Sequence, residues 1–200
     1  MTTLRQFTCD DLFRFNPVNL DPLTETYGVG FYLQYLARWP EYFLVAESPS
    51  NDIMGYIMGK AEGMIISFDY AFSKIKIFNL FTLIFIDLGT SENWHGHVTA
   101  VTCSPQHRRL GLAAKLMAAL EEISEKKRCY FVDLFVRVSN KVAITMYKNL
   151  GYTVYRTVIQ YYSGDVDEDA YDMRKALSKD SEKKSMIPLE RPVHIDELEY

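Results

Sequence analysis

Two hydrophobic periods divide this chain into strands and helices. Short alternating or continuous apolar runs predict strands, and apolar residues spaced three and four apart predict helices. Thr8 and Asn140 are expected N-caps, and the first helix is expected to stop before Pro17. The predicted strands are Thr3–Phe7, Tyr42–Glu47, Ile53–Ala61, Trp94–Cys103, Cys129–Val138, Tyr152–Tyr162 and Tyr171–Leu177. The predicted helices are Asp10–Asn16, Gly30–Trp39, a long one that follows Gly111, and Lys141–Leu150.

The long helix after Gly111 joins two strands that should be parallel. Its apolar stripe has helical spacing and consists of Leu112, Leu116, Leu120 and Ile123. A strand, a helix and a strand in this order form a right-handed crossover. Trp94–Cys103 and Cys129–Val138 are therefore predicted to run side by side in the same direction.

The other strands favour antiparallel pairing. Tyr42–Glu47 and Ile53–Ala61 flank a Ser-, Pro-, Asn- and Asp-rich turn, which predicts a hairpin. Cys129–Val138 is apolar on both faces, as a central strand requires. The fold class is therefore α/β (α+β), with a mixed, mostly antiparallel central sheet flanked by helices.

Composition narrows the class of protein. A length of 200 residues suits one domain, and a net charge of −4 argues against direct nucleic-acid binding. The three cysteines have no metal-like spacing, so reduced thiols and no metal site are expected. No signal-peptide pattern opens the chain, so a cytoplasmic location is expected.

The segment Met64–Asn93 interrupts this pattern. It is rich in Phe and Ile, and it separates two strands that should be joined by a short turn. Lys74, Lys76 and Asn79 break its apolar run, which is too short to span a membrane. The segment could be an extra hairpin, a flap that touches a membrane or partner, or translated non-coding sequence. We favour the last interpretation, because its apolar content has no evident place in the core.

The C-terminal segment Ser178–Tyr200 has the opposite character. It is rich in charge, contains Pro188 and Pro192, and shows no apolar period. We expect a loosely ordered tail that could dock on a partner.

A basic turn before the long helix is a candidate anion site. Arg108 to Ala113 form an R-x-x-G-x-A pattern in which Gly111 permits close approach of the backbone. The first N–H groups of a helix lack partners within the helix and lie at its positive end, so this turn suits a phosphate or pyrophosphate. His107, Arg108, Arg109 and Lys115 add positive charge. The alternative is a plain connection with a solvated basic corner.

Two later motifs support the anion site. Asn140 to Tyr147 form N-x-x-A-x-x-x-Y, and Leu150-Gly151-Tyr152 follow. With the R-x-x-G-x-A turn, these motifs resemble the GNAT superfamily of acetyl-CoA-dependent N-acetyltransferases. Further segments resemble the catalytic subunits of the NatB family of eukaryotic N-terminal acetyltransferases: Phe7–Phe13, Asn19–Gly28, Trp94–Thr99, Asp133–Asn140 and Asp169–Arg174.

This resemblance implies a GNAT domain over residues 1–177, with an atypical insertion at 64–93 and a charged tail at 178–200. The central sheet of such a domain is splayed at its parallel strand pair. The implied reaction is transfer of acetyl from acetyl-CoA to the α-amine of nascent proteins that begin Met-Asp, Met-Glu, Met-Asn or Met-Gln. The implied partners are a large helical-repeat auxiliary subunit, which the helix Gly30–Trp39 could contact, and the ribosome through that subunit.

The resemblance also implies a cofactor site. The turn holds the pyrophosphate of acetyl-CoA, a backbone N–H near Val101–Cys103 polarises the thioester carbonyl, and Asn140 holds the pantetheine arm. Tyr147 is the candidate proton donor to the departing sulfur, although a core aromatic would have the same pattern. The candidate cofactor residues are Val101, Cys103, Arg108, Arg109, Leu110, Gly111, Leu112, Ala113, Asn140 and Tyr147.

A second group of residues is a candidate peptide site. His97 and Thr99 alternate on one face of their strand, with Val98 and Ala100 on the other. His97 and Thr99 are candidates for gripping the second substrate residue, and His97 also for a water-mediated base. A neutral histidine that donates a hydrogen bond accepts Asp, Glu, Asn or Gln alike, because all carry a side-chain carbonyl oxygen. The candidate peptide clamp consists of Glu25, Tyr27, Tyr161 and Tyr162.

Three functions remain open from the sequence. The first is a NatB-type peptide α-N-acetyltransferase. The second is a GNAT enzyme for small amines or lysine side chains. The third is a catalytically impaired subunit in which Met64–Asn93 disturbs the sheet beside His97.

Overall fold

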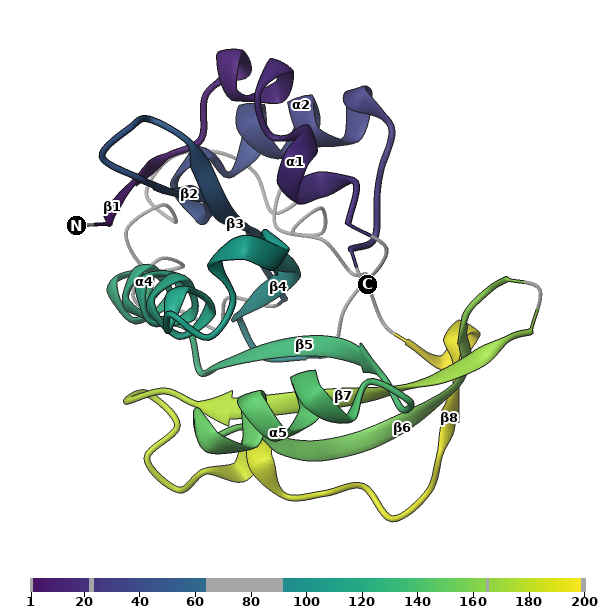
Figure 1. Cartoon of the computed structure of the whole chain (residues 1–200). Coiled ribbons are helices and arrows are strands. Elements are labelled where there is room, and N and C mark those ends of the chain that lie inside the picture. Colours follow the sequence, from purple (N-terminus) through teal and green to yellow (C-terminus); the bar gives the residue numbers. More distant parts are fainter. Residues whose placement is uncertain (1, 22–23, 64–91, 165, 199–200) are drawn as a thin grey trace, which may run out of the picture.

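The computed structural model describes residues 2–21, 24–63, 92–164 and 166–198 (Figure 1). The strands are β1 (Thr3–Gln6), β2 (Phe43–Glu47), β3 (Ile53–Glu62), β4 (His95–Cys103), β5 (Phe131–Arg137), β6 (Thr153–Tyr162), β7 (Glu168–Ala176) and β8 (Val193–His194). The α-helices are α1 (Asn16–Asn19), α2 (Val29–Arg38), α4 (Leu112–Lys126) and α5 (Lys141–Asn149). Short 3-10 helices lie at Cys9–Phe13, Pro40–Tyr42, Pro105–His107, Lys184–Met186 and Ile195–Glu197.

One mixed sheet carries the whole fold. Its strand order is β1-β2-β3-β4-β5-β7-β6-β8, with parallel pairs at β4–β5 and β6–β8 and antiparallel pairs elsewhere among the described residues. The prediction of a mostly antiparallel sheet with β4 and β5 parallel is confirmed.

The parallel pair separates part-way along its length. Pairing between β4 and β5 ends at Val98 and Leu134. On its other side β4 stays paired with β3 as far as Cys103, and β5 stays paired with β7 as far as Arg137. Since neither strand ends where their own pairing does, the two strands splay apart beyond Val98 and Leu134; Figure 1 shows where β4 and β5 lie in the sheet.

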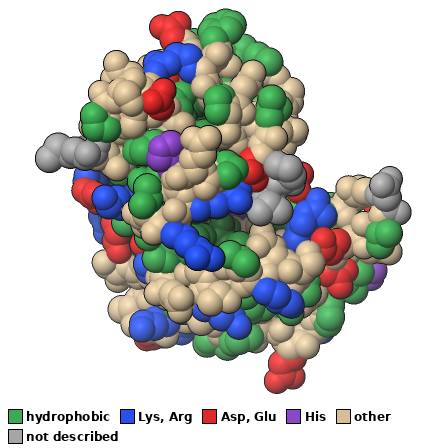
Figure 2. Space-filling view, in the orientation of Figure 1, with side chains coloured by type: hydrophobic (Ala, Val, Ile, Leu, Met, Phe, Trp, Pro, Cys, Tyr) green, Lys and Arg blue, Asp and Glu red, His purple; other side chains and the backbone are tan. Residues whose placement is uncertain are grey.

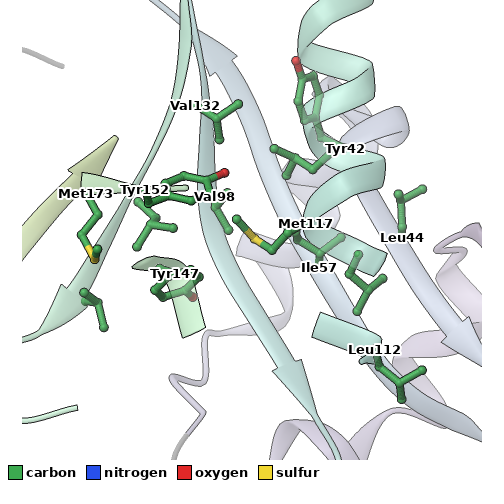
Figure 3. Packing of buried hydrophobic residues seen from close by; sticks show 14 of the residues in the cluster. Tyr42, Leu44, Ile57, Val98, Leu112, Met117, Val132, Tyr147, Tyr152 and Met173 are labelled. Atoms are coloured by element: carbon green, nitrogen blue, oxygen red, sulfur yellow. The ribbon is translucent and has the colours of Figure 1, made fainter. Parts of the chain in front are cut away.

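Helices cover both faces of the sheet. The larger core cluster joins one sheet face to α4 and α5 through buried side chains such as Leu116, Met117 and Ile144. Figure 3 shows this cluster, with Val98 and Ile57 of the strands beside Met117 of α4. A second cluster packs α1 and α2 against the opposite face of β2 and β3. The opening between β4 and β5 is therefore framed by α4 and α5 on one face and by the α1–α2 region on the other.

The α4 helix follows its predicted stripe. Leu112, Leu116 and Leu120 are buried, and Ile123 packs partly buried beside them. Gly111 is the residue that precedes the helix, with φ of 73°. This left-handed conformation is costly for residues with a Cβ, so glycine suits the turn.

A β-bulge changes the pattern predicted for β4. The β3–β4 register shifts so that Met58 faces Ala100 and Gly59 faces Val98, which leaves Thr99 without a register partner. Val98 then packs in the α4 cluster and Ala100 against the α1–α2 cluster. The prediction that Val98 and Ala100 share a face is wrong, because the extra residue reverses the alternation after it.

The first helix also differs from its prediction. The segment predicted as one helix forms a 3-10 helix at Cys9–Phe13 and then α1. Thr8 is the predicted N-cap of the first piece and forms a capping box with Asp11. Pro17 lies inside the first turn of α1 rather than beyond a helix end, because the first turn needs no N–H from proline.

The C-terminal segment is ordered against the sheet, so the prediction of a loose tail is wrong. Val193 pairs with Val158 through β8, and the Leu189 N–H donates to the Tyr155 carbonyl at 2.7 Å. Val193 and Leu198 are buried with Val158 in a third small cluster. These apolar residues are too widely spaced to give a helical or strand periodicity in the sequence, yet each packs against the sheet.

Most of the predicted insertion lies outside the described residues, so the three interpretations of it stay untested. Its flanks are described: Glu62 still pairs with His95, and a Cβ on Gly63 would lie 2.6 Å from the Asn93 carbonyl oxygen. The sheet beside His97 is therefore continuous up to the point where the segment leaves it. Within the described part of the chain, no helix has the length and apolar character needed to cross a membrane.

Candidate functional site

The turn before α4 has the geometry of an anion site. Arg109 and Gly111 both have positive φ, of 62° and 73°, which curls the backbone into the start of α4. A Cβ placed on Gly111 would meet no atom of the chain within 4 Å, and Leu110 is exposed. Figure 2 shows Lys and Arg side chains across the middle of this face, over the region where α4 meets β5. Accessible N–H groups at a helix start beside cations fit a pyrophosphate.

Arg108 ties this turn to the α1–α2 loop. Its Nη2 lies 2.7 Å from Oδ1 of Asp21, a buried carboxylate. The neighbouring His107 shares a hydrogen bond of 2.7 Å between its Nδ1 and the Ser104 hydroxyl. The basic corner is thus partly neutralised by the loop that faces it.

Tyr147 of α5 and Cys103 at the end of β4 belong to the same core cluster. Tyr147 is buried on α5, and burial together with the neighbouring Cys103 raises the pKa of its hydroxyl well above the usual value. Burial also raises the pKa of the Cys103 thiol to about 11, although Arg108 and a hydrogen bond from the Ala113 N–H oppose this. Both groups are therefore neutral at pH 7, and Cys103 is a poor nucleophile there.

The remaining cofactor candidates lie around this pair. Val101 packs partly buried against the α4 cluster, and Leu112 is a buried member of that cluster. Asn140 caps α5, where its Oδ1 accepts the Ala143 N–H at 3.1 Å. Because the side-chain oxygen of Asn140 is used in the cap, its amide NH₂ is the group that can donate hydrogen bonds to a ligand.

His97 lies opposite Asp133 across the parallel strand pair. The two are register partners, and His97 Nδ1 lies 2.9 Å from Asp133 Oδ1. Both side chains are buried. Burial opposes ionisation of Asp133, yet His97 and His95 hold the pKa of its carboxyl far below the usual range.

Thr99 of β4 and Tyr27 of the α1–α2 loop both contact aromatic residues of α2. The Thr99 hydroxyl lies 2.8 Å from the Tyr35 hydroxyl, so the bulge in β4 is pinned to α2. The Tyr27 ring stacks on Phe31 at 4.5 Å between centroids, and the Tyr27 N–H donates to the Tyr32 hydroxyl. Burial, with Glu25 adding to it, raises the pKa of Tyr27 to about 12, so its hydroxyl stays protonated.

Arg137 joins the two walls of the opening. Its Nη2 lies 2.7 Å from Glu25 of the α1–α2 loop, and its Nη1 lies 3.3 Å from Glu168 of β7. Its guanidinium also sits 4.1 Å from the centroid of the Tyr162 ring, a cation–π distance. Glu25 and Tyr162, predicted as a clamp from distant parts of the chain, are thus brought together by a residue that the sequence did not single out.

The paired tyrosines of β6 have different surroundings. Burial raises the pKa of Tyr162, and Glu25, Tyr27 and Tyr147 lie within electrostatic reach of its hydroxyl. Tyr161 stacks on Phe135 at 4.6 Å and packs against the third cluster. Tyr161 also packs edge-on against Tyr162, with ring centroids 5.0 Å apart.

The structure adds residues that the sequence did not indicate. Asp133 is the one polar residue between Phe131 and Val136, and its place opposite His97 depends on the parallel register. Tyr35 and Arg137 act through partners far away in the chain. A polar residue inside an otherwise apolar central strand was the available signal for Asp133.

The expectation of no metal site remains a prediction. Glu92, His95 and Asp133 place possible ligand atoms within 4.8 Å of one another. However, Oε1 of Glu92 lies 2.8 Å from Arg174 and 3.2 Å from Arg156, and these two positive charges disfavour a cation there.

Replacing Arg137 with Gln is expected to loosen the clamp. The variant loses two ion pairs and a cation–π contact, so, for the peptide substrate and acetyl donor that the GNAT resemblance implies, the KM for the peptide should rise about tenfold while the KM for the acetyl donor stays unchanged. Steady-state kinetics with each substrate varied in turn measure this. Arg191→Gln, which breaks an ion pair with Glu197 in the C-terminal segment, is the matched control. Equal rises in both KM values would show a general loss of structure instead.

The fold and the splayed opening define an acetyltransferase. The model of the acetyltransferase (GNAT) family matches residues 6–152, and the chain belongs to that family. The catalytic subunit of the N-terminal acetyltransferase B complex of Arabidopsis thaliana is 57% identical over 201 residues, which cover 100% of this chain and 99% of the relative. Within the GNAT family the chain is thus an N-terminal acetyltransferase of the NatB catalytic-subunit type, as its motifs predicted.

Solved structures agree. Naa20 of Chaetomium thermophilum in complex with a bisubstrate analogue is 40% identical, with a TM-score of 0.77 and coverage of 96% of both chains. A structure of the NatB complex bound to CoA and MES is 41% identical, with a TM-score of 0.69 and coverage of 88% of this chain and 99% of the other.

Proposed function

We propose that this chain transfers acetyl from acetyl-CoA to the α-amine of nascent proteins that begin Met-Asp, Met-Glu, Met-Asn or Met-Gln. The observation that carries the proposal is the splay between β4 and β5. One side of this opening presents Tyr147, Cys103 and the turn before α4, and the other presents His97, Thr99 and the Arg137 clamp. An acyl donor and a peptide terminus can therefore meet between the two sides.

The residues around the turn suit acetyl-CoA. Backbone N–H groups from Arg109 to Ala113 would hold the pyrophosphate, with Arg108 shared between it and Asp21. The amide NH₂ of Asn140 would hold the pantetheine arm. The bound thioester supplies the activated acetyl group. CoA in the related NatB complex structure supports this assignment.

The protonation states support direct transfer. A peptide α-amine has a pKa of about 8, so a useful fraction is already neutral near pH 7 and a strong base is unnecessary. The neutral Cys103 thiol does not compete for the acetyl group, so an acyl-enzyme intermediate is not required. The protonated Tyr147 hydroxyl would give a proton to the departing sulfur, and the proton that the attacking amine releases would return to Tyr147 through solvent.

His97 and Thr99 would contact the second substrate residue. The His97 side chain contacts Asp133 of the neighbouring strand β5, and the Thr99 side chain contacts Tyr35 of α2. Glu25, Tyr27 and Tyr162 would then hold the first residue and its amine. The clamp of loop residues on a rigid sheet favours a peptide terminus over a small amine.

A helical-repeat auxiliary subunit is the proposed partner, and the ribosome would be reached through it in the cytoplasm. Large apolar side chains are exposed around α1 and α2, on a surface formed by Phe13, Leu20, Val29 and Leu33. Phe13 is 85% exposed, which is unusual for a large aromatic side chain without a partner. The related structure of a NatB complex supports this assignment.

Acetyl transfer to synthetic peptides tests the proposal. The full chain, alone and co-expressed with the auxiliary subunit, is assayed on a Met-Asp peptide and on a Ser-initiated control. Transfer to the Met-Asp peptide alone is expected, and equal rates on both would sink the assignment.

A second chain tests the impaired-subunit alternative. It lacks residues 64–91, whose flanks Gly63 and Glu92 lie in contact: a Cβ on Gly63 would be 2.9 Å from the Glu92 carbonyl oxygen. Activity of this shortened chain together with inactivity of the full chain would favour the impaired subunit.

A further inference from the structure

The ring of His97 is held by a carboxylate that the proposed reaction does not yet use. Asp133 lies directly opposite on β5, with its Oδ1 2.9 Å from Nδ1 of His97. A carboxylate only accepts hydrogen bonds, so the proton on this bond belongs to His97 Nδ1. The ring is thereby fixed, and Nε2 is the atom left for a substrate.

Further charges surround the ring from every packed strand. On β3, Glu62 Oε1 lies 3.9 Å from His97 Nδ1, and Lys60 pairs with Glu62. On β4, His95 Nε2 lies 3.8 Å from both Glu62 and Asp133. On β7, Arg174 acts on Asp133 from behind.

The balance of these charges favours a protonated ring. Burial and Lys60 act to lower the pKa of His97, but Asp133 and then Glu62 raise it above its usual value. The Nδ1 atom of His95 contacts the Asn93 carbonyl oxygen instead, at 2.7 Å. His97 is therefore the ring that Asp133 holds by a direct hydrogen bond.

We propose that Asp133 keeps His97 as an imidazolium whose Nε2–H donates to the side chain of the substrate's second residue, so that the enzyme prefers acidic second residues over their amides. This inference rests on the function proposed above and makes Asp133 a positioning residue. A hydrogen bond from a charged donor to a carboxylate is stronger than one to a neutral amide. The preference is present at pH values below the His97 titration and is lost as pH rises through it.

This role differs from that of a general base. An imidazolium cannot accept a proton from the substrate amine, whereas a neutral ring can. In the general-base case, rates on acidic and amide peptides would change together. In the proposed case, their ratio changes.

The test compares kcat/KM for Met-Asp and Met-Asn peptides from pH 6 to 9, with the full chain in complex with its auxiliary subunit. In Asp133→Asn the new amide oxygen still accepts from Nδ1, so the ring keeps its orientation but loses its charge. The Met-Asp to Met-Asn ratio at low pH should fall about tenfold, as the difference between charged and neutral hydrogen bonds predicts. The wild-type ratio should fall toward the variant's ratio as pH rises.

Asp180→Asn is the matched control. Asp180 is also a buried, hydrogen-bonded aspartate, but its partners are Lys184 and Ser185 of the C-terminal segment. Its replacement should leave the ratio unchanged. If Asp133→Asn does not fold, His97→Gln keeps a neutral donor and should lower the ratio in the same way.

NMR of the ring nitrogens of His97 gives an independent readout. The ring should titrate at a lower pH in Asp133→Asn than in the wild type. A wild type that is active with an unchanged ratio in both variants, or a His97 already neutral at pH 6, would overturn the inference. A wild type that acetylates neither peptide would instead overturn the proposed function.

Discussion

Tyr147→Phe is expected to lower kcat about hundredfold and to leave the affinity for acetyl-CoA nearly unchanged. The hydroxyl is buried beside Cys103 and stays protonated, so its loss removes a proton donor but no packing. Positioned general acids contribute typically 10²–10⁴-fold to a rate. Steady-state kinetics on a Met-Asp peptide measure kcat, and calorimetric titration with CoA measures binding.

A control separates chemistry from packing in this experiment. Tyr152 also has a buried ring, 6.0 Å from that of Tyr147, but its hydroxyl donates to Glu121 on α4, away from the opening. Tyr152→Phe should therefore lower stability without a comparable loss of kcat. An unchanged kcat in Tyr147→Phe would remove Tyr147 from the mechanism.

Arg174→Ala is expected to destabilise the fold by about 3 kcal/mol. Arg174 is buried on β7, where its Nη2 lies 2.9 Å from Asp172 and 2.8 Å from Glu92. Removal of Arg174 leaves these two carboxylates with Arg156 as their shared cation, and one negative charge that stays unbalanced in a buried site typically costs 3–5 kcal/mol. Urea unfolding measures the free energy, and Tm should fall by roughly 6 to 12 °C for a chain of this size.

The adjacent Lys175 provides the control for Arg174. Its Nζ lies 2.6 Å from Glu121, and its side chain is 30% exposed. Lys175→Ala should cost less than about 1 kcal/mol, because the Glu121 carboxylate that remains still accepts the Tyr152 hydroxyl and reaches water. Equal losses in the two variants would mean that burial of the Arg174 network contributes nothing.

The parts of the molecule that were predicted correctly are those with local signals. The stripe of α4, the Asn140 cap and the α4 turn each depend on residues within one or two helical turns of one another. The prediction that Tyr147 lies near the thioester stays a prediction, and it required the family motif as well, because its helix alone also suited a core aromatic.

The parts that were missed depend on distant residues. The bulge at Thr99 arises because Met58 and Gly59 of β3 pair with Ala100 and Val98 on either side of it, which nothing within β4 indicates. The Arg137–Glu25 pair joins residues 112 apart in the chain. The ordered C-terminal segment was missed for the same reason, since Val193 acquires its place only once β6 exists.

Two ion pairs attach the α1–α2 loop to the rest of the molecule, and the arginine of each pair is open to water. Asp21 is held by Arg108 of the turn before α4 and Glu25 by Arg137 of β5, and both arginine side chains are more than a third exposed, at 41% and 35%. Exposed pairs weaken with ionic strength, with a screening length of about 8 Å at physiological salt. Salt should therefore loosen this loop at both ends at once, while the buried His97–Asp133 pair is screened much less.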